Sequence, residues 1–454
     1  MVEPFVAKSL TGWGRIAPRV CHVYRPEKPR LIENILRDLS QPHFIARGLG
    51  RSYGDTAVNE GGGVIDFARL NRMMRFDPAT GVLECEAGVT LAEIIETFLP
   101  RGFFLPVTPG TKFVTVGGAI ANDVHGKNHH RDGTFGQFVL DFGLYTPEGH
   151  LLLCSPEDNP DLFWATVGGI GLTGVILTAR IRLQPVRSAY IVADYHKSRD
   201  LDDALATFEA SDARYQYSVA WVDCLARGAM LGRCILMRGN HADPAQLPGS
   251  LAAKPFDVRP RRDKRVPVDC PAFLLNPLNV RVFNNLFYGM HRSVEGQIID
   301  YDRYFYPLDQ IHDWNRLYGR RGFVQYQATL PTESAKGLVA LLERLSTERR
   351  GSFLGVLKRF GDAGPGLLSH PMKGYTLTLD IPNRTGLVPF LRELDRILLD
   401  HGGRLYLAKD AVAAPETVAV MYPDLDRFRE IKGRVDPENR LSSSMARRLG
   451  IVGV

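Results

Sequence analysis

The chain has 454 residues, of which 44% are hydrophobic and 23% charged. This composition is typical of a soluble globular protein with two or three domains and a large core. The net charge of +6 is small for this length and gives no reason to expect a nucleic-acid partner.

The six cysteines are scattered, with no C-x-x-C and no metal-type pairing. We therefore expect free thiols, mostly in the core, and no disulfide framework. No segment approaches the roughly eighteen consecutive apolar residues of a membrane-spanning helix. The N-terminal stretch MVEPFVAKSLTGWGR lacks the charged and apolar regions of a signal peptide. A cytoplasmic location, or a peripheral one at the cell membrane, is the expectation.

Residues from about 20 to 185 alternate short strands and short helices. Val64–Phe67 is an apolar strand, and Val82–Ala87 is a second that follows the turn formers of 77–81, DPATG. Thr90 is placed to cap a helix. The apolar residues of that helix share one face at helical spacing; they are Leu91, Ile94, Ile95 and Phe98.

A hairpin is expected next, because Phe142–Tyr145 and Leu151–Cys154 flank the turn formers Pro147-Glu148-Gly149. Asp161–Val167 predicts a short helix and Val175–Leu183 a strand. From about 186 to 404 the pattern indicates a second α+β domain with an antiparallel sheet. Its predicted strands are Tyr190–Asp194, Tyr215–Asp223, Phe323–Leu330, Phe353–Phe360 and Tyr375–Ile381, and its predicted helices are Leu201–Phe208, Thr332–Leu345 and Gly386–Leu399.

Within that domain, residues from about 240 to 310 are rich in proline, arginine, asparagine and aromatic residues. Leu274–Met290 mixes apolar residues with asparagine and arginine. Three interpretations stay open for it: a mobile lid, a surface that meets lipid, or a plain irregular insertion.

Two glycine-rich, charge-poor stretches carry the strongest functional signal. They are 46–73, ARGLGRSYGDTAVNEGGGVIDFARLNRM, and 109–138, PGTKFVTVGGAIANDVHGKNHHRDGTFGQF. Glycine permits tight turns and lets backbone N–H groups approach a ligand closely. Two such loops about sixty residues apart suggest a long ligand with a phosphate-bearing middle, which points to a flavin dinucleotide and an oxidase.

The segment Gly48–Gly54, GLGRSYG, follows the apolar residues 44–46. A strand-to-loop turn of this kind presents consecutive N–H groups to phosphate oxygens. It is not a P-loop, because Gly-Lys-Ser/Thr is missing, and not a Rossmann fingerprint, because position 53 is Tyr. Gly169–Gly174 does match G-x-G-x-x-G, but it follows a helix-like segment and opens the β-branched run Val175-Ile176, so a nicotinamide site is not expected there.

His125, His129 and His130 lie in HGKNHH, and the first two have i, i+4 spacing. Only Asp132 stands nearby to complete a metal set, so no metal is predicted. His125 is better explained as a histidine beside a flavin or substrate, and solvated loop positions are expected for His129 and His130.

Lysine is usually a surface residue. Lys409 follows the strand-like 404–407, and Lys358 ends the apolar Phe353–Leu357, so either one could instead meet an anionic substrate. The basic run Arg259–Arg265, RPRRDKR, is a solvated loop or a contact with an anionic substrate or membrane surface.

Longer motifs carry a resemblance to a known family. They are ARGLGRSYGD (46–55), PGTKFVTVGGAIANDVHGKNHH (109–130), LFWATVGGIGLTG (162–174), YSVAWVD (217–223), WNRLYG (314–319), GFVQYQ (322–327), GGRLYLAKD (402–410) and SSSMARRL (442–449). On these the chain resembles the flavoproteins of vanillyl-alcohol-oxidase type, and within them the members that oxidise a polyprenylphosphoryl ribose. The resemblance implies an α+β fold: a two-lobed FAD-binding domain of p-cresol-methylhydroxylase (PCMH) type over 1–185, an antiparallel-sheet substrate (cap) domain over 186–404, and a C-terminal segment, 405–454, that returns to the FAD domain.

The same resemblance implies site residues. At the cofactor it implies Arg47, Gly48, Leu49, Gly50, Arg51, Ser52, Tyr53, Gly54, Asp55, Gly110, Thr115, Val116, Gly117, Gly118, Asn122, His125, Ile176 and Tyr406. As catalytic residues it implies Lys409, His125, Gln325 and Tyr53, and as substrate-binding residues Lys127, Trp221, Gln327, Lys358 and Thr378.

Two positions depart from the family pattern. Related oxidases often attach FAD covalently through a histidine in a G-x-G-H-S loop, and here that position is Arg51, so noncovalent FAD is predicted. Mycobacterial members carry a cysteine where this chain has Thr378, so electrophiles aimed at that cysteine should not react here.

The implied reaction is oxidation of the 2′-hydroxyl of a polyprenylphosphoryl-β-D-ribose to the 2′-keto sugar. A separate keto-reductase would complete epimerisation to the arabinose donor for cell-wall polysaccharide. Lys409 or a neutral His125 would take the hydroxyl proton, and the lipid tail would lie along 270–290 at a membrane surface. The alternatives are an aldonolactone or alditol oxidase of the same fold, a non-enzymatic flavin-binding protein, and a nicotinamide dehydrogenase built on Gly169–Gly174.

Overall fold

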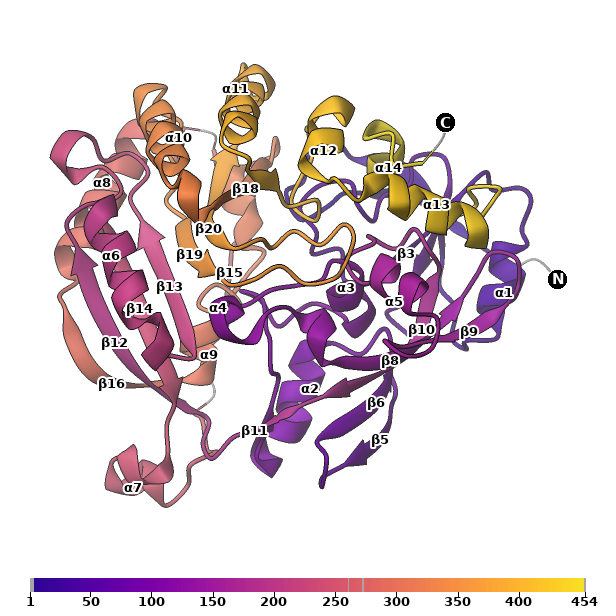
Figure 1. Cartoon of the computed structure of the whole chain (residues 1–454), viewed down its shortest axis with the longest axis horizontal. Coiled ribbons are helices and arrows are strands. Elements are labelled where there is room, and N and C mark those ends of the chain that lie inside the picture. Colours follow the sequence, from indigo (N-terminus) through magenta and orange to yellow (C-terminus); the bar gives the residue numbers. More distant parts are fainter. Residues whose placement is uncertain (1–3, 260, 272, 453–454) are drawn as a thin grey trace.

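The computed structural model describes residues 4–259, 261–271 and 273–452, so residue 260 of the basic run lies outside them. The N-terminal part holds two sheets (Figure 1). The first has the order β1 (Val6–Leu10), β2 (Arg19–Tyr24), β4 (Gly63–Asp66), β3 (Phe44–Arg47), with helix α1 (Leu31–Leu36) between β2 and β3 in sequence. Strands β2, β4 and β3 are parallel. The carboxyl end of β3 therefore delivers the first glycine-rich loop.

The second sheet is antiparallel and supports the second glycine-rich loop. Its order is β5 (Met73–Asp77), β6 (Val82–Glu86), β10 (Val175–Arg182), β8 (Val139–Tyr145), β9 (Leu151–Cys154). Helices α2 (Leu91–Phe98), α3 (Val116–Ala121) and α5 (Pro160–Thr166) belong to the same part. The predicted strands, the hairpin and the two predicted helices of this region are confirmed.

A third sheet has eight strands, all antiparallel to their neighbours. Its order is β16 (Val294–Asp300), β12 (Tyr190–Ser198), β14 (Cys234–His241), β13 (Tyr217–Val222), β19 (Gly355–Phe360), β20 (Gly374–Pro382), β18 (Phe323–Pro331), β21 (Arg404–Leu405). Helices α6 (Leu201–Ser211), α10 (Lys336–Thr347) and α11 (Leu387–Asp400) lie along it (Figure 1). The predicted antiparallel sheet and α+β class are confirmed.

The C-terminal helices α12 (Pro415–Met421), α13 (Leu425–Val435) and α14 (Ser444–Arg448) lie beside the N-terminal part (Figure 1). The backbone N–H of Phe44 donates to Arg440 O at 2.7 Å, and Ser442 N–H donates to Phe44 O at 2.9 Å. Arg448 pairs with Asp55 at 2.7 Å and with Asp410 at 2.9 Å. This end of the chain therefore braces the loop that follows β3.

The remaining elements complete the described chain. They are α4 (His129–Asp132), α7 (Gly249–Ala252), α8 (Pro277–Met290), α9 (Tyr301–Phe305), β7 (Phe103–Phe104), β11 (Gln184–Pro185), β15 (Lys264–Arg265) and β17 (Ile311–His312), with 3-10 turns between them, among them η6 (Trp314–Tyr318).

Helix starts follow local sequence. Thr90 accepts a hydrogen bond from Glu93 N–H while the Glu93 carboxylate accepts from Thr90 N–H, so the predicted cap of α2 is a full capping box. The irregular-insertion interpretation of Leu274–Met290 is wrong, because most of it is helix α8. The sequence does contain the signal for the start of this helix. Asn276 is the N-cap and accepts from Leu278 N–H and Asn279 N–H, and Pro277 occupies the first helical position.

Other sequence expectations are also settled. Gly169–Gly174 follows α5 and leads into β10, so it is not the strand-to-helix turn of a nicotinamide site. All six cysteines are free and five of them are buried. Across the residues that the structure describes, helices long and apolar enough to cross a bilayer are absent.

Candidate active site

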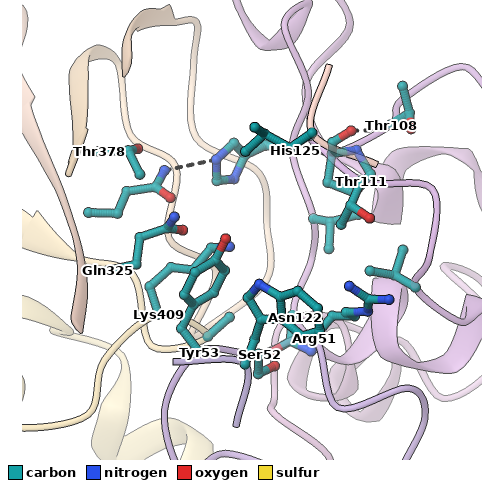
Figure 2. A pocket seen from close by; sticks show the side chains of 18 of the residues that line it. Arg51, Ser52, Tyr53, Thr108, Thr111, Asn122, His125, Gln325, Thr378 and Lys409 are labelled. Carbon is teal, nitrogen blue, oxygen red and sulfur yellow. Dashed lines mark hydrogen bonds between the residues drawn. The ribbon is translucent and has the colours of Figure 1, made fainter. Parts of the chain in front are cut away.

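A cavity of about 820 Å³ lies between the glycine-rich loops and the eight-stranded sheet. Figure 2 shows one part of it, with Arg51, Ser52 and Tyr53 from the loop after β3, His125 from the second loop, and Gln325, Thr378 and Lys409 from the third sheet and the segment after β21. Two loops far apart in sequence and the third sheet thus contribute to one site.

The two glycine-rich loops touch directly. A side chain at Gly48 would collide with the Thr115 hydroxyl, so only glycine permits this approach. Gly50 has φ +62° and lies against the Arg47 guanidinium, which donates to Ala57 O at 2.8 Å and Thr11 O at 2.7 Å. Arg47 therefore holds the loop from behind while the loop backbone faces the cavity.

The backbone N–H groups of residues 49–52 have no acceptor among the described residues, whereas Tyr53 N–H donates to Ala408 O at 3.0 Å. In the second loop, Gly117 N–H donates to Ala87 O and Gly118 N–H to the Thr115 hydroxyl. The free donors that suit a pyrophosphate are therefore those of 49–52, and Thr115, Gly117 and Gly118 line the cavity by close approach.

Arg51 stacks its guanidinium over the Trp13 ring, 4.0 Å from the centroid, and burial lowers its pKa from the usual value. It lines the cavity, where it adds a positive charge beside the free N–H groups.

His125 is buried, and its position is fixed from the third sheet. Gln327 Nε2 donates to His125 Nε2 at 2.9 Å, so the ring proton is on Nδ1. Burial, reinforced by the charge of Lys358, holds the pKa of His125 well below its usual range, so the ring is neutral. The Nδ1 atom is buried without a partner in the described chain, as is Asn122 Oδ1.

Tyr406 closes this side of the cavity: its hydroxyl donates to Asn122 O at 2.7 Å. The unpaired Asn122 oxygen, the close approach of Gly48 to Thr115 and the free N–H groups of 49–52 form a donor and acceptor set that fits a flavin ring joined to a pyrophosphate. The residues present therefore fit FAD.

Beside them lies a reactive cluster. The Lys409 ammonium lies over the Tyr53 ring, 4.0 Å from its centroid, and Gln325 donates to Asp380 Oδ1 at 2.6 Å. Burial lowers the pKa of Lys409 from 10.5 to about 7, an effect that the Asp380 carboxylate partly offsets. A lysine of this kind holds or releases a proton near neutral pH.

Two further lysines face the cavity. Lys127 donates to Tyr304 O and lies 4.3 Å from the centroid of that ring. Burial and the neighbouring Lys358 lower the pKa of Lys127 to about 7, and burial lowers the pKa of Lys358 to about 8. Among the residues that the structure describes, no carboxylate contributes to either shift, as expected of a site for an anionic ligand. The surface interpretation of Lys358 and Lys409 is wrong, because both line the cavity.

Most residues expected at the site line this cavity. They are Arg47, Gly48, Leu49, Gly50, Arg51, Ser52, Tyr53, Gly110, Thr115, Gly117, Gly118, Asn122, His125, Lys127, Ile176, Trp221, Gln325, Gln327, Lys358, Thr378, Tyr406 and Lys409. Three do not line it: the Val116 side chain is in the core, Gly54 packs against Asp410 O, and Asp55 pairs with Arg448. The solvated position expected for His129 is wrong, since it is 2% exposed at the start of α4.

Sequence reasoning missed Asp380, Trp13 and the aromatic residues Phe283 and Phe287 of α8, all of which line the cavity. The sequence does offer an indication of Asp380. It lies two residues after Thr378 on the same strand, so both side chains face one side of the sheet. Phe283 and Phe287 are four residues apart and share one face of a helix that was not predicted.

Comparison with known proteins agrees with this geometry. The FAD binding domain model matches residues 21–155, and the D-arabinono-1,4-lactone oxidase model matches 380–449. The chain is 40% identical over 456 residues to decaprenylphosphoryl-beta-D-ribose oxidase of Mycolicibacterium smegmatis, with 99% of both chains covered.

Two further relatives are similar over a smaller share of this chain. An uncharacterized protein in the mprA 5′ region of Streptomyces coelicolor is 39% identical over 371 residues, covering 80% of this chain and 100% of the relative. Cytokinin dehydrogenase 10 of Oryza sativa subsp. japonica is 32% identical over 213 residues, covering 43% of this chain and 38% of that protein. This chain is an FAD-dependent oxidoreductase and belongs to the decaprenylphosphoryl-beta-D-ribose oxidase family.

Proposed function

We propose that this chain oxidises the 2′-hydroxyl of a polyprenylphosphoryl-β-D-ribose to the 2′-keto sugar, with FAD held noncovalently. The observation that carries the proposal is that one cavity is lined by three kinds of group. They are the free backbone N–H groups at 49–52, Lys409 with its near-neutral pKa, and the neighbouring lysines Lys127 and Lys358. The full-length similarity to the mycobacterial oxidase supports the same substrate class.

Lys409 is the proposed base. Its pKa near 7 leaves a neutral amine available at slightly alkaline pH, and the sugar hydroxyl proton moves to its Nζ atom. FAD, when bound, supplies the acceptor for the hydride that leaves the carbinol carbon. Tyr53 packs beneath the ammonium and limits its movement. Substitution of Lys409 by methionine should lower kcat by about 10²- to 10⁴-fold.

His125 and Gln325 orient the ribose. His125 is neutral and offers its Nδ1–H, while Gln325 offers its carbonyl oxygen because its amide nitrogen is engaged by Asp380. Gln327 holds the His125 ring, and Thr378, directly opposite Gln327 on β20, lines the same wall. Trp221 closes the far side, where its indole N–H donates to Phe353 O at 2.9 Å.

Lys127 and Lys358 hold the phosphodiester. A bound anion favours their protonated forms. Substrate binding should therefore raise the pKa values of both lysines, which burial has lowered. Beyond them the cavity is lined by apolar residues of the third sheet and α8, which suits a prenyl chain; these are Tyr195, Val219, Ile235, Met237, Phe283 and Phe287.

An aldonolactone or alditol oxidase is the second candidate, favoured by the match of 380–449 to the D-arabinono-1,4-lactone oxidase model. Such substrates carry no phosphate. Lys358→Ala should therefore raise KM for a prenylphosphoryl ribose by about 10- to 100-fold, the effect of one lost charge-assisted hydrogen bond. Undiminished activity of this variant on a sugar lactone would favour the second candidate.

The direct test is an anaerobic visible spectrum of the purified protein, recorded with and without a prenylphosphoryl ribose. Bleaching of the flavin band is expected with the ribose and not with the matching 2′-deoxyribose. Acid precipitation should release the flavin into the supernatant, because Arg51 cannot bond it. A flavin that stays unbleached would contradict the substrate, and one that pellets with the protein would contradict noncovalent binding.

We also propose that α8 contacts an anionic membrane surface. The helix is apolar on its outer side: Leu278, Val282, Leu286 and Met290 are spaced four residues apart and are 69%, 49%, 60% and 73% exposed. Arg281 and Arg292 are exposed beside them and suit anionic headgroups. An outward apolar stripe flanked by arginine is typical of an interfacial helix.

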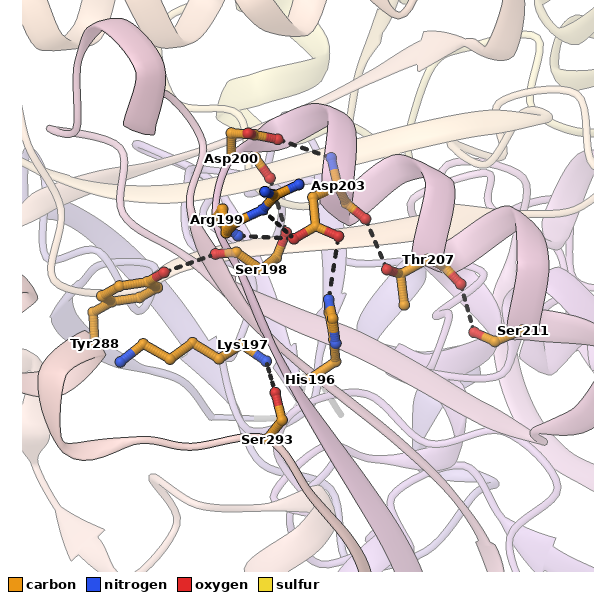
Figure 3. A network of polar contacts seen from close by, with 10 residues as sticks. All are labelled: His196, Lys197, Ser198, Arg199, Asp200, Asp203, Thr207, Ser211, Tyr288 and Ser293. Atoms are coloured by element: carbon orange, nitrogen blue, oxygen red, sulfur yellow. Dashed lines mark hydrogen bonds and ion pairs between the residues drawn. The ribbon is translucent and has the colours of Figure 1, made fainter.

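The inner side of α8 is held to the third sheet by apolar and polar groups. Phe287 packs against Trp221 with ring centroids 4.6 Å apart, and Asn284 donates to Asp223 at 2.8 Å. Asp223 is also paired with Arg233 at 2.7 Å. Figure 3 shows the Tyr288 hydroxyl donating to Ser198 O, beside the capped start of α6. Because Phe283 and Phe287 line the cavity from the same helix, a lipid-linked substrate would enter beneath α8 from the bilayer.

Sedimentation with vesicles tests this contact. The protein should pellet with phosphatidylglycerol vesicles and less with phosphatidylcholine vesicles. The double variant Leu278→Glu/Leu286→Glu should stay in solution, whereas Leu151→Glu/Leu153→Glu, which alters exposed leucines of β9, should still pellet. Failure of the unmodified chain to pellet, or equal loss in both variants, would contradict the proposal.

The 2′-keto product requires a second enzyme if the sugar is to be epimerised, because the proposed site only removes hydride. We propose that a separate keto-reductase consumes the product. Addition of this chain to such a reductase with its reduced cofactor should yield the 2′-epimer from the prenylphosphoryl ribose, and neither protein alone should do so.

A further inference from the structure

Asp380 is buried at the end of the cavity where Gln325 and Lys409 lie. It is 2% exposed, and the register of β18 and β20 places it directly opposite Gln325. Gln325 Nε2 donates to its Oδ1 atom at 2.6 Å, and its own backbone N–H donates to the Ser352 hydroxyl at 3.2 Å. Gln325 therefore holds the carboxyl group, and Ser352 holds the backbone that carries it.

Four groups on four different elements face this carboxyl: Gln325 on β18, Tyr318 on η6, Tyr53 on the loop after β3, and Lys409 after β21. Figure 2 shows Gln325, Tyr53 and Lys409 side by side. Three other charged groups shift the pKa values of these neighbours. Lys358 lowers the pKa of Lys409, while Arg51 lowers and Asp309 raises the pKa of Tyr53.

The hydrogen bond determines which atom Gln325 presents. An amide has one nitrogen that donates and one oxygen that accepts. Above its pKa of about 7 Asp380 is ionised and can only accept, so the nitrogen faces Asp380 and the carbonyl oxygen is left for the cavity side. Without the carboxylate, the amide could turn over and present a donor to a sugar hydroxyl instead.

We propose that Asp380 is a positioning residue for the oxidation: it fixes the Gln325 amide with its oxygen toward the substrate, and it acts as the counter-charge of Lys409. The part that concerns Lys409 rests on the proposed function, in which that lysine is the base. The orientation of Gln325 does not depend on it.

The electrostatics are consistent with this geometry. Burial raises the pKa of Asp380 from 3.8 to about 7, opposed by the Gln325 hydrogen bond and by the Lys409 charge. The Asp380 charge in turn raises the pKa of Lys409 against the effect of burial. Removal of the carboxylate therefore lowers the pKa of Lys409, so the neutral amine persists to lower pH.

The test compares Asp380→Asn with Asp395→Asn. Asp395 is a matched control: it is also 2% exposed, burial also raises its pKa to about 7, and Tyr326 donates to it at 3.0 Å, but it does not line the cavity. Two quantities are measured on the FAD-loaded proteins. One is the pH profile of kcat/KM, and the other is the pH dependence of Lys409 acetylation by acetic anhydride, read by mass spectrometry.

In Asp380→Asn, both the acidic limb of kcat/KM and the acetylation midpoint of Lys409 should move down by about one pH unit, with flavin content unchanged. Neither should move in Asp395→Asn. An unmoved acetylation midpoint in Asp380→Asn, or an equal shift in both variants, would overturn the inference. A midpoint that moves while the kcat/KM limb does not would support the inference and overturn the assignment of Lys409 as base.

Discussion

Gln327 and His125 join the two halves of the active site: the amide nitrogen on β18 donates to the imidazole Nε2 of the second glycine-rich loop at 2.9 Å. The bond leaves the ring proton on Nδ1, and burial holds the pKa of His125 well below its usual range. His125 is therefore neutral throughout the range of an assay, and it cannot be the origin of a pH dependence near 7.

The pH dependence should instead come from three lysines. Lys409 must be neutral to take a proton, so kcat/KM should rise with pH through about 7. Lys127 and Lys358 must be charged to hold a phosphate, so kcat/KM should fall as the pH passes about 7 and then about 8. A bell-shaped profile with its maximum between these values is expected in a stopped assay over roughly pH 5.5–10, which extends about 1.5 to 2 units beyond the lysine pKa values.

The matched variant is the double variant Lys127→Arg/Lys358→Arg, because a guanidinium stays charged over this range. The alkaline limb should disappear in that variant while the acidic limb stays in place. An alkaline limb that persists in the double variant would mean that another group releases the phosphate.

The close contact between the two glycine-rich loops gives a second prediction. In Gly48→Ala the new methyl group would collide with the Thr115 hydroxyl, so one loop must move away from the other. Flavin content, measured as the ratio of visible to ultraviolet absorbance, should fall sharply. Gly433→Ala on α13, where a methyl group would meet nothing within 4 Å, should keep full flavin content. Equal flavin content in the two variants would contradict this account of the loop contact.

Some elements and site residues could be predicted from the sequence, and others could not. Short-range patterns predicted α2 from Thr90 and the apolar face behind it, because a cap and a period need only local information. Lys409 was singled out by spacing, but its burial depends on the fold of three segments. Asp380 was missed because its function comes from its cross-strand partner Gln325, and register is not visible within one strand.

The incorrect expectations have the same physical origin. His129 stands among glycine, lysine and asparagine, a composition typical of a solvated loop, but strand β19 covers it and Gly361 N–H donates to its Nδ1 atom at 3.2 Å. The interpretation of α8 stayed open between three alternatives because its apolar residues lie on both sides of the helix. Val280 is buried and Phe287 lines the cavity, whereas Leu286 is exposed, so no single apolar stripe marks the helix. Both cases depend on tertiary packing, which sequence patterns do not encode locally.

Thr378 gives a third prediction. It lines the cavity opposite Gln327, and five of the six cysteines are buried elsewhere. A cysteine-directed electrophile small enough for the cavity should therefore leave position 378 unmodified and the activity unchanged. Thr378→Cys, which differs little in size, should keep its activity and gain one adduct at that position by peptide mass spectrometry. Threonine cannot form such an adduct. If the electrophile inactivates the unmodified chain, the reaction must therefore be at another residue, and Lys409 would be the first candidate.

The capping box of α2 gives the last prediction. Thr90 caps the helix through Glu93 and also forms a β-bridge with Thr115, which lies directly against Gly48. Thr90→Ala should cost roughly 1 kcal/mol of unfolding free energy and lower the melting temperature of the FAD-loaded protein by about 2 °C. Thr90→Ser keeps a hydroxyl that can cap and should melt with the unmodified chain. Because the backbone bridge to Thr115 survives in both variants, flavin content should not change; a loss of flavin in Thr90→Ala alone would mean that the cap, and not the bridge, positions the Thr115 loop.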